Sequence, residues 1–302
     1  MIETKKIWRP NNVKDAWEIQ TNLKPSEYCY VSGGTWLRTQ WEADLKEMPS
    51  NLISLEQIHE MKEVKEILFL GKREIVIGSQ VNLAACIKNP LLIKCLSPLV
   101  KACRNIAAPS IRNVATIGGN IYTAAGDTIP AFLIHNAKMR WFNGKEMETE
   151  LMEEWLIGLQ ANEMKRDQRI LVDISVEIDE RSNEDFSFFQ KVGRRETFTA
   201  SLVTVAGKGK ISSEGTFQEV SLAAGGGPIP FRLPHTESEL QNTEGSEDLF
   251  KTIFPVITKE FNATSDPFAS SDYKKTTVAN LIISELFEQW DGNGGVSIVA
   301  GS

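Results

Sequence analysis

Two glycine-containing stretches decide how this chain folds, Val31-Ser32-Gly33-Gly34-Thr35-Trp36 and Ala115-Thr116-Ile117-Gly118-Gly119-Asn120. The first stretch lies between a β-rich run and a helix-like segment. Glycine permits positive φ angles and leaves room for a ligand beside the main chain. Successive N–H groups in such a loop, followed by a helix N-terminus, can converge on an anion such as a pyrophosphate. The alternative for this loop is a tight strand–helix turn without a ligand.

The second stretch places polar groups on both sides of its glycine pair. Thr116 offers a hydroxyl donor, and the amide of Asn120 can both donate and accept hydrogen bonds. These groups suit a polar ligand better than a simple turn requires. Neither pair fits G-x-G-x-x-G, and G-x-x-x-x-G-K-[ST] does not occur in the sequence. The dinucleotide fingerprint of a Rossmann fold and the usual P-loop are therefore excluded.

Composition restricts the class of protein. A chain of 302 residues exceeds the usual single core, so two or three modest units are expected. A formal net charge of −7 argues against binding to nucleic acid or to an anionic membrane surface. No apolar run approaches the roughly 20 residues that a membrane span needs. The N-terminus lacks the apolar region of a secretory signal, so a cytoplasmic location is predicted.

The order of strand and helix patterns predicts an α+β protein. Residues 1–52 have a β-α-β-α pattern and form a first subdomain, and residues 53–180 form a second. Residues 186–290 are predicted to form a meander of three antiparallel strands with helices covering one face. Residues 291–302 are rich in glycine and serine and are interpreted as a flexible tail.

Two helix predictions in the second subdomain bear on the site. Apolar spacing predicts one continuous helix over residues 91–103. A second helix is predicted over residues 127–135, with Asp127 as a plausible N-cap.

The residue types that usually bind metals form no constellation in this sequence, and no metal ligand is assigned. The cysteines are Cys29, Cys86, Cys95 and Cys103. The last three are spaced loosely like iron–sulfur ligands, but their apolar surroundings favour buried thiols that act as small hydrophobic groups. The absence of a C-x-x-C pair weakens a zinc or redox-motif interpretation. The histidines, His59, His135 and His235, are predicted to lie at the surface or at helix ends.

Taken in order, the two glycine stretches closely resemble the A-G-G-T and A-T-[IL]-G-G-N signatures of the FAD-binding family of molybdopterin dehydrogenases. The lead-in Ile111-Arg112-Asn113-Val114 is also similar to that family. Three downstream features look like its C-terminal domain. They are Lys191-Val192-Gly193-Arg194-Arg195, the pair Gly225-Gly226 that follows Ala223, and Tyr273. The resemblance covers nearly the whole chain. It implies two α/β subdomains forming a PCMH/VAO-type FAD-binding domain, followed by the three-stranded sheet-and-helix domain.

The resemblance also implies the positions of the residues that hold FAD. These are Val31, Ser32, Gly33, Gly34, Thr35, Trp36, Ile106, Thr116, Ile117, Gly118, Gly119, Asn120, Asp127, Leu171 and Lys191. Main-chain N–H groups of the first loop would hold the pyrophosphate, while the second stretch would contact the pyrophosphate, the ribityl chain and the flavin surroundings. Ile106 would offer the cofactor an apolar wall. Asp127 would accept a hydrogen bond from a ribose hydroxyl, or it simply caps its helix.

Lys191 and the main chain near Leu171 would lie near the flavin ring. A cation there could stabilise the negative charge of a reduced flavin. The alternative is that Lys191 is a solvated strand residue. Three features depart from the family pattern. Ser32 replaces an alanine, Trp36 stands where an acidic residue or asparagine is common, and the link from Asn120 to Asp127 is short.

The function implied by the resemblance is electron transfer, with no catalytic residue for the organic substrate on this chain. Electrons would pass from iron–sulfur clusters through FAD to NAD+ in a xanthine dehydrogenase-like molybdenum hydroxylase of purine catabolism. The partners would be a molybdopterin-binding large subunit and a [2Fe–2S] small subunit. Two alternatives stay open, namely a self-contained flavin reductase of the same broad fold and an FAD-free assembly partner, in which bulky Trp36 blocks the first loop.

Overall fold

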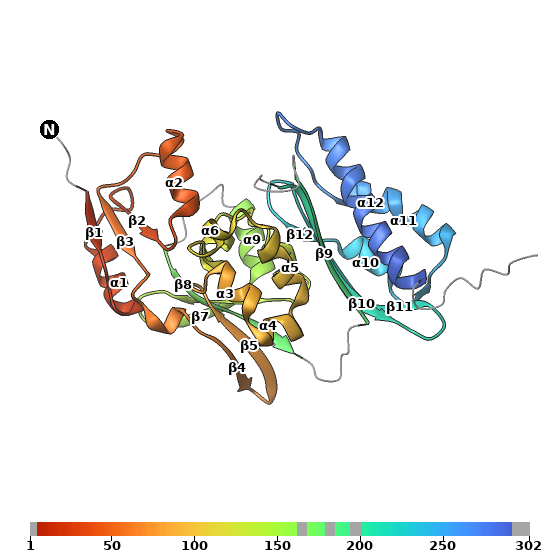
Figure 1. Cartoon of the computed structure of the whole chain (residues 1–302), viewed down its shortest axis with the longest axis horizontal. Helices are drawn as coiled ribbons and strands as arrows, with labels where there is room; N and C mark the ends of the chain where they lie inside the picture. Colours follow the sequence, from red (N-terminus) through yellow and green to blue (C-terminus); the bar gives the residue numbers. More distant parts are fainter. Residues whose placement is uncertain (1–4, 162–167, 179–184, 194–200, 292–302) are drawn as a thin grey trace, which may run out of the picture.

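The computed structural model describes residues 5–161, 168–178, 185–193 and 201–291 as three consecutive bodies (Figure 1). Arg194, Arg195, most of the expected boundary between residues 180 and 186, and nearly all of the expected tail lie outside the described residues. No helix in the described part of the chain is both long and apolar enough to cross a membrane.

The first subdomain is a small parallel sheet with two helices. Its elements are β1 (Lys6–Trp8), α1 (Val13–Thr21), β2 (Tyr28–Val31), α2 (Thr35–Glu42) and β3 (Asn51–Ser54). The strand order is β1-β3-β2, and both pairings are parallel. Asn12 caps α1 by accepting a hydrogen bond from the Asp15 amide at 2.8 Å, as its side-chain type predicts. Strand β3 spans the expected boundary at residue 52.

The second subdomain is built on an antiparallel sheet with the order β4-β5-β8-β6-β7. Its elements are β4 (Val64–Phe69), β5 (Lys72–Gly78), α3 (Leu83–Lys88), α4 (Pro90–Cys95), α5 (Ser97–Asn105), α6 (Pro109–Arg112), α7 (Ile117–Ile121), α8 (Ile129–Leu133), β6 (Lys138–Phe142), β7 (Met147–Leu151), α9 (Met152–Ala161) and β8 (Ile170–Ile178), preceded by a 3-10 turn, η1 (His59–Met61). The helices and the sheet enclose one apolar core.

Two helix predictions in this subdomain are wrong in their bounds. The continuous helix expected over residues 91–103 is divided into α4 and α5, because Pro98 lies in the first turn of α5 and cannot continue a preceding helix. The helix expected from Asp127 begins at Ile129, with Thr128 at the N-cap position. Asp127 is therefore not the cap, and its carboxylate is free to make the interactions described below.

The C-terminal body is a sheet with helices, as expected, but both faces of the sheet are covered. Its strands are β9 (Phe186–Gly193), β10 (Ser201–Ile211), β11 (Thr216–Gly225), β12 (Phe231–Arg232) and β13 (Thr243–Glu244). Its helices are α10 (Pro234–Leu240), α11 (Glu247–Glu260) and α12 (Ser271–Trp290). The meander β9-β10-β11 matches the prediction, and β12 and β13 add two short pairings to β11.

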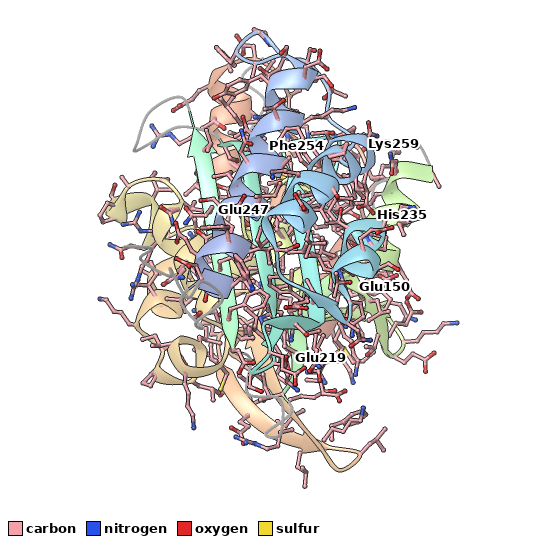
Figure 2. All side chains as sticks on the ribbon, turned by 90° about the vertical axis from the view of Figure 1, so that its right-hand side faces the viewer. Glu150, Glu219, His235, Glu247, Phe254 and Lys259 are labelled. Carbon is pink, nitrogen blue, oxygen red and sulfur yellow. The ribbon has the colours of Figure 1, made fainter. Side chains whose placement is uncertain are left out.

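Side-chain alternation explains the two covered faces. Phe188 is part of the core beneath α10, α11 and α12, which lie over the outer face of the sheet (Figure 2). The next residue, Phe189, points to the other face and joins the core of the second subdomain. There β9 contacts α5, and β10 and β11 contact α8. The expectation of one covered face is corrected, because helices of the preceding subdomain supply the second cover.

Candidate cofactor site

The first glycine loop presents main-chain donors that the protein does not use. Gly34 adopts a left-handed conformation with φ of 66° and precedes α2, which has no side-chain cap. Within the described residues, no hydrogen bond is donated by the amides of residues 33–36. Unpaired N–H groups at a helix N-terminus favour an anion, since the helix dipole adds partial positive charge there. The loop is therefore suited to bind a phosphate group.

The fold brings this loop directly against the second glycine stretch. A Cβ atom built on Gly33 would lie 2.0 Å from the carbonyl oxygen of Val114, so only glycine fits there. The Ser32 hydroxyl accepts a hydrogen bond of 2.7 Å from the side-chain amide of Gln80. The fold thus brings together two stretches whose glycine pairs, beginning at Gly33 and Gly118, are 85 positions apart in sequence.

The second glycine stretch differs from the first because its amides are bonded inside the protein. Ile117 donates to the Val81 carbonyl at 2.9 Å, and Gly118 donates to the Ser79 carbonyl at 2.8 Å. The amide of Gly119 donates to the Thr116 hydroxyl at 3.1 Å. These groups are therefore not free donors for a pyrophosphate, and Thr116 acts as the N-cap of α7.

Glycine still has a reason to be present at both positions of the second pair. A Cβ on Gly118 would lie 2.6 Å from the Cβ of Ser79, so this glycine is needed for packing. A Cβ on Gly119 would meet only the Thr116 hydroxyl, at 3.1 Å. Among the described residues, no other atom fills the space beside Gly119, so there is room for a ligand to approach the main chain there.

Asn120 connects the second stretch to the segment that follows it. Its side-chain oxygen accepts hydrogen bonds from the Thr128 amide at 3.1 Å and from the Thr128 hydroxyl at 2.6 Å. Its Nδ2 group donates to no described residue, although it can form two hydrogen bonds. A Cβ on Gly126 would lie 2.3 Å from that same Asn120 oxygen, so the short link noted in the sequence wraps closely around Asn120.

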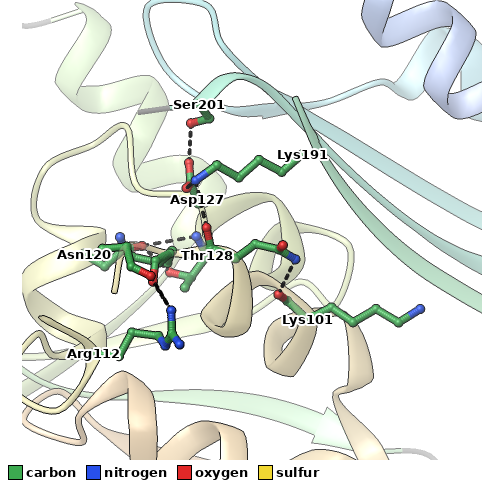
Figure 3. Close-up of polar contacts among 10 residues, drawn as sticks. Lys101, Arg112, Asn120, Asp127, Thr128, Lys191 and Ser201 are labelled. Carbon is green, nitrogen blue, oxygen red and sulfur yellow. Dashed lines mark hydrogen bonds and ion pairs between the residues drawn. The ribbon is translucent and has the colours of Figure 1, made fainter. Parts of the chain in front are cut away.

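Asp127 and Lys191 form an ion pair between the second subdomain and the C-terminal sheet (Figure 3). The Lys191 ammonium lies 2.8 Å from the Asp127 carboxylate and donates to the Asn105 carbonyl at 3.0 Å. Ser201, at the start of β10, donates to the other carboxylate oxygen. Both charged side chains are only 12% exposed. Lys191 is consequently not a solvated strand residue.

The remaining two expected residues lie beside these groups. Ile106 is half-buried directly after α5, and its carbonyl accepts a hydrogen bond of 2.8 Å from Arg112, which also donates to the carbonyl of Ala107 (Figure 3). Leu171 is buried in β8, and the carbonyl of the next residue, Val172, accepts the Ser79 amide at 2.9 Å. The expected residues are therefore linked through neighbours into one region.

The polar groups of this region fit a phosphate-bearing, hydrogen-bonding ligand. The unbonded amides of the first loop suit a pyrophosphate, and Asn120 retains a donor. The Ser79 hydroxyl is buried next to Gly118 and forms no hydrogen bond with the described residues. Buried polar groups in native proteins are normally paired. A polar ligand at this site would give these groups partners that the described protein atoms do not supply.

Sequence patterns did not reveal several residues that build the site. Ser79, Gln80, Thr128 and Ser201 belong to no recognisable motif, and their roles follow from tertiary contacts. Trp36, which was expected as a possible obstruction, is 41% exposed, and the Lys46 ammonium lies 4.7 Å from the centroid of its ring.

The cysteines and histidines form no metal centre in the part of the chain that the structure describes. All four cysteines are free thiols, and Cys86 and Cys103 are buried in the apolar core, as predicted. A hydrogen bond to Cys86, together with burial, raises the pKa of Cys103. His135 lies at a helix end, as predicted, because it directly follows the C-cap of α8, but it is buried and only 7% exposed. His235 lies on the surface of α10 (Figure 2).

Comparison with known protein families identifies the chain. Residues 3–176 match the FAD-binding domain of molybdopterin dehydrogenases, and residues 187–288 match the C-terminal domain of the carbon monoxide dehydrogenase flavoprotein. The chain belongs to the molybdopterin dehydrogenase FAD-binding family. FAD is its cofactor, and the chain is an oxidoreductase subunit of the molybdenum hydroxylase type.

Individual relatives agree with this assignment. A xanthine dehydrogenase FAD-binding subunit of Escherichia coli O157:H7 is 26% identical, with the alignment covering 76% of this chain and 79% of the relative. A nicotinate dehydrogenase FAD-subunit of Eubacterium barkeri is 21% identical, with 95% and 97% covered. A chain of carbon monoxide dehydrogenase from Hydrogenophaga pseudoflava has the same fold, with a TM-score of 0.85 at 20% identity and coverage of 96% and 99%.

Proposed function

We propose that this chain carries electrons through FAD to NAD+ within a three-chain molybdenum hydroxylase that oxidises purines. The observation that supports the location of FAD is the contact between the two glycine stretches. There, Gly33 packs against Val114, directly before the second stretch, and the first loop has four unbonded amides. FAD, when bound, supplies the electron-accepting and hydride-donating chemistry, and the protein supplies position and electrostatics.

The residues of the chain divide this task. The amides of residues 33–36 hold the pyrophosphate, with the Thr35 hydroxyl assisting. Asn120 donates through its free Nδ2 group, and the unfilled space beside Gly119 lets the cofactor approach the main chain. Ile106 and Leu171 supply apolar and main-chain surroundings for the ring.

The ion pair changes the role expected for Lys191. Because Asp127 lies 2.8 Å from the ammonium, the local charge is that of a pair rather than of a lone cation. The pair still presents a positive end that can stabilise a negatively charged reduced ring. The Asp127 carboxylate, oriented by Lys191 and Ser201, has remaining lone pairs that can accept from a ribose hydroxyl.

The partners proposed are a molybdopterin-binding large subunit and a [2Fe–2S] small subunit in the cytoplasm. The relatives support a multi-chain enzyme, because both are named as FAD subunits. Their names refer to xanthine and to nicotinate as substrates, so the purine assignment follows from the xanthine relative alone. Residues that select the organic substrate belong to another chain in this proposal.

Isolation of the complex from its native source tests the proposal. An affinity tag on this chain should recover two companion chains, one with a molybdenum cofactor and one with [2Fe–2S] clusters. The isolated complex should oxidise hypoxanthine and xanthine while it reduces NAD+. Nicotinate serves as the matched substrate control, and faster turnover with nicotinate would replace the purine assignment.

One outcome would favour a different function. If the chain were recovered alone with FAD bound and reduced an organic substrate with NAD(P)H, it would be a self-contained reductase. Recovery without FAD, together with failure to bind added FAD, would instead indicate an assembly partner.

A further inference from the structure

We infer that Gln80 is a positioning residue for the pyrophosphate-binding loop and that its hydrogen bond to Ser32 sets the affinity for the ADP half of FAD. The inference rests on the proposed placement of the FAD pyrophosphate at residues 33–36. Its starting point is the 2.7 Å hydrogen bond from the Gln80 side-chain amide to the Ser32 hydroxyl. Gln80 itself is only 8% exposed.

The turn that carries Gln80 is fixed on both sides. The main-chain amide of Gln80 donates to the Met61 carbonyl at 2.8 Å. Two residues earlier, Gly78 packs so closely against Met61 that a Cβ atom on Gly78 would lie 2.1 Å from the Met61 carbonyl oxygen. On the other side, the carbonyls of Ser79 and Val81 accept the amides of the second glycine stretch. The side chain of Gln80 therefore starts from a rigid position.

The first loop has much weaker support of its own. Its amides are unbonded, and α2 behind it buries no side chain. Among the described residues, the Gln80–Ser32 bond is the only hydrogen bond that joins residues 32–36 to the second subdomain. Gly33 touches Val114, but that contact is steric and does not fix the direction of the loop.

This bond also gives a physical reason for a departure from the family pattern. The family signature has alanine where this chain has Ser32, and alanine cannot accept the Gln80 amide. Preorganised donors bind an anion more tightly than donors that must first be ordered, because less conformational entropy is lost on binding. Loss of the Gln80–Ser32 hydrogen bond should thus reduce the affinity for the pyrophosphate-containing ADP half of FAD without changing the surroundings of the flavin ring.

The test uses the full chain with FAD and ADP as probes. Ser32→Ala and Gln80→Leu should each weaken the binding of both probes about tenfold, the size of one lost hydrogen bond. The double variant should be no weaker than the single variants, because both remove the same link. Gln80→Glu should restore part of the affinity, since a carboxylate can accept a hydrogen bond from the Ser32 hydroxyl. The absorption spectrum and midpoint potential of bound FAD should be unchanged.

Gln20 provides a matched control. It is also a buried glutamine, 4% exposed, whose side chain donates to the Gln168 carbonyl at 3.1 Å and accepts from the hydroxyls of Tyr28 and Tyr30. Among the described residues, its side chain forms no hydrogen bond with residues 32–36. Gln20→Leu should reduce the melting temperature without weakening ADP binding. Unchanged ADP affinity in both Ser32→Ala and Gln80→Leu would overturn the role of Gln80 while leaving the FAD site intact. Failure of the unmodified chain to bind either probe would overturn both proposals.

Discussion

The two glycine stretches look alike in sequence, but their main-chain amides are bonded differently in the structure. In the first, the amides of residues 33–36 are unbonded, and the following helix buries no side chain. In the second, the amides of Ile117, Gly118 and Gly119 are all bonded within the protein. The first loop is therefore a surface of unused donors, to which we propose that the ligand binds. The second is a rigid wall whose main-chain amides are already bonded within the protein, while the Asn120 Nδ2 group has no acceptor among the described residues.

The difference teaches that a glycine pair does not by itself indicate a phosphate-binding loop. Gly118 is needed because Ser79 packs against it. Among the described residues, only the Thr116 hydroxyl lies close to the Cβ position of Gly119, so we propose that this glycine leaves space for the cofactor. The two neighbouring glycines should respond in opposite ways to substitution, and this response is the most direct test of the comparison.

Gly119→Val should give the largest effect on cofactor binding. The added side chain occupies space that faces only the Thr116 hydroxyl, at 3.1 Å, so the chain should fold while the cofactor is excluded. FAD affinity, measured by quenching of flavin fluorescence, should fall by about 100-fold or more, as expected when main-chain approach is blocked.

Gly118→Ala is the matched variant for this prediction. Its Cβ would lie 2.6 Å from the Ser79 Cβ, so the variant should lose thermal stability even without cofactor. The comparison of the two stretches would be wrong if Gly119→Val bound FAD normally, or if both variants lost the same amount of stability.

Lys191→Met should have the next largest effect. It tests whether the ion pair between Lys191 of β9 and Asp127 stabilises the segment that follows the second glycine stretch. The substitution leaves the Asp127 carboxylate mostly buried without its cation. Breaking a partly buried pair from one side should cost about 2–3 kcal/mol of the free energy of unfolding, somewhat below the value for a fully buried pair. Chemical denaturation measures this loss.

An exposed pair supplies the control for Lys191. Lys251 pairs with Glu247 and Asp248 on α11, where all three side chains are at least 70% exposed. Lys251→Met should therefore change stability by less than about 0.5 kcal/mol. Asp127→Leu combined with Lys191→Met should recover part of the stability lost by Lys191→Met, because no buried charge is left unpaired. Equal losses for Lys191→Met and Lys251→Met would contradict an inter-domain role for the ion pair.

Acidification should give the smallest effect, through His135 behind α8. Burial, with a contribution from the charge of Lys208, lowers the pKa of His135 well below its usual value. The unfolded chain takes up a proton near pH 6.5 and the folded chain does not, so stability falls as the pH drops below that value. At pH 5.5 the loss should be about 1 kcal/mol.

Comparison of unfolding curves at pH 7.5 and 5.5 measures this contribution. His135→Leu should reduce the pH dependence, because it removes the buried imidazole. An identical pH dependence in the unmodified chain and in His135→Leu would show that burial of His135 does not affect acid stability.

Helices and strands with a clear local pattern were predicted well from the sequence. Breaks within helices and polar strands at sheet edges were predicted poorly. The β-α-β-α order of the first 52 residues and the antiparallel meander β9-β10-β11 agree with the structure. Strand β7 was not predicted, because Met147–Leu151 carries polar side chains at an exposed edge of the sheet. Pro98 divided the expected long helix at a point that apolar spacing alone does not reveal.

The candidate site was predictable only in part, for the same physical reason. Motif order placed the two glycine stretches together, and the Gly33–Val114 contact agrees with this. Which amides stay unbonded depends on partners such as Ser79 and Val81, which lie more than 30 residues away in the sequence from Gly118. The Asp127–Lys191 pair similarly joins residues whose separation of 64 positions carries no local signal.

The sheet with two covered faces has a consequence for how the chain is made. Synthesis proceeds from the N-terminus, so α5 and α8 are complete before β9, β10 and β11 emerge from the ribosome. Until then, the apolar surface that later packs against Phe189 is exposed to water and to other chains. The interval between residues 134 and 225 should therefore be the period in which a nascent chain most needs protection by chaperones, and truncation within it should yield aggregating protein rather than a smaller flavoprotein.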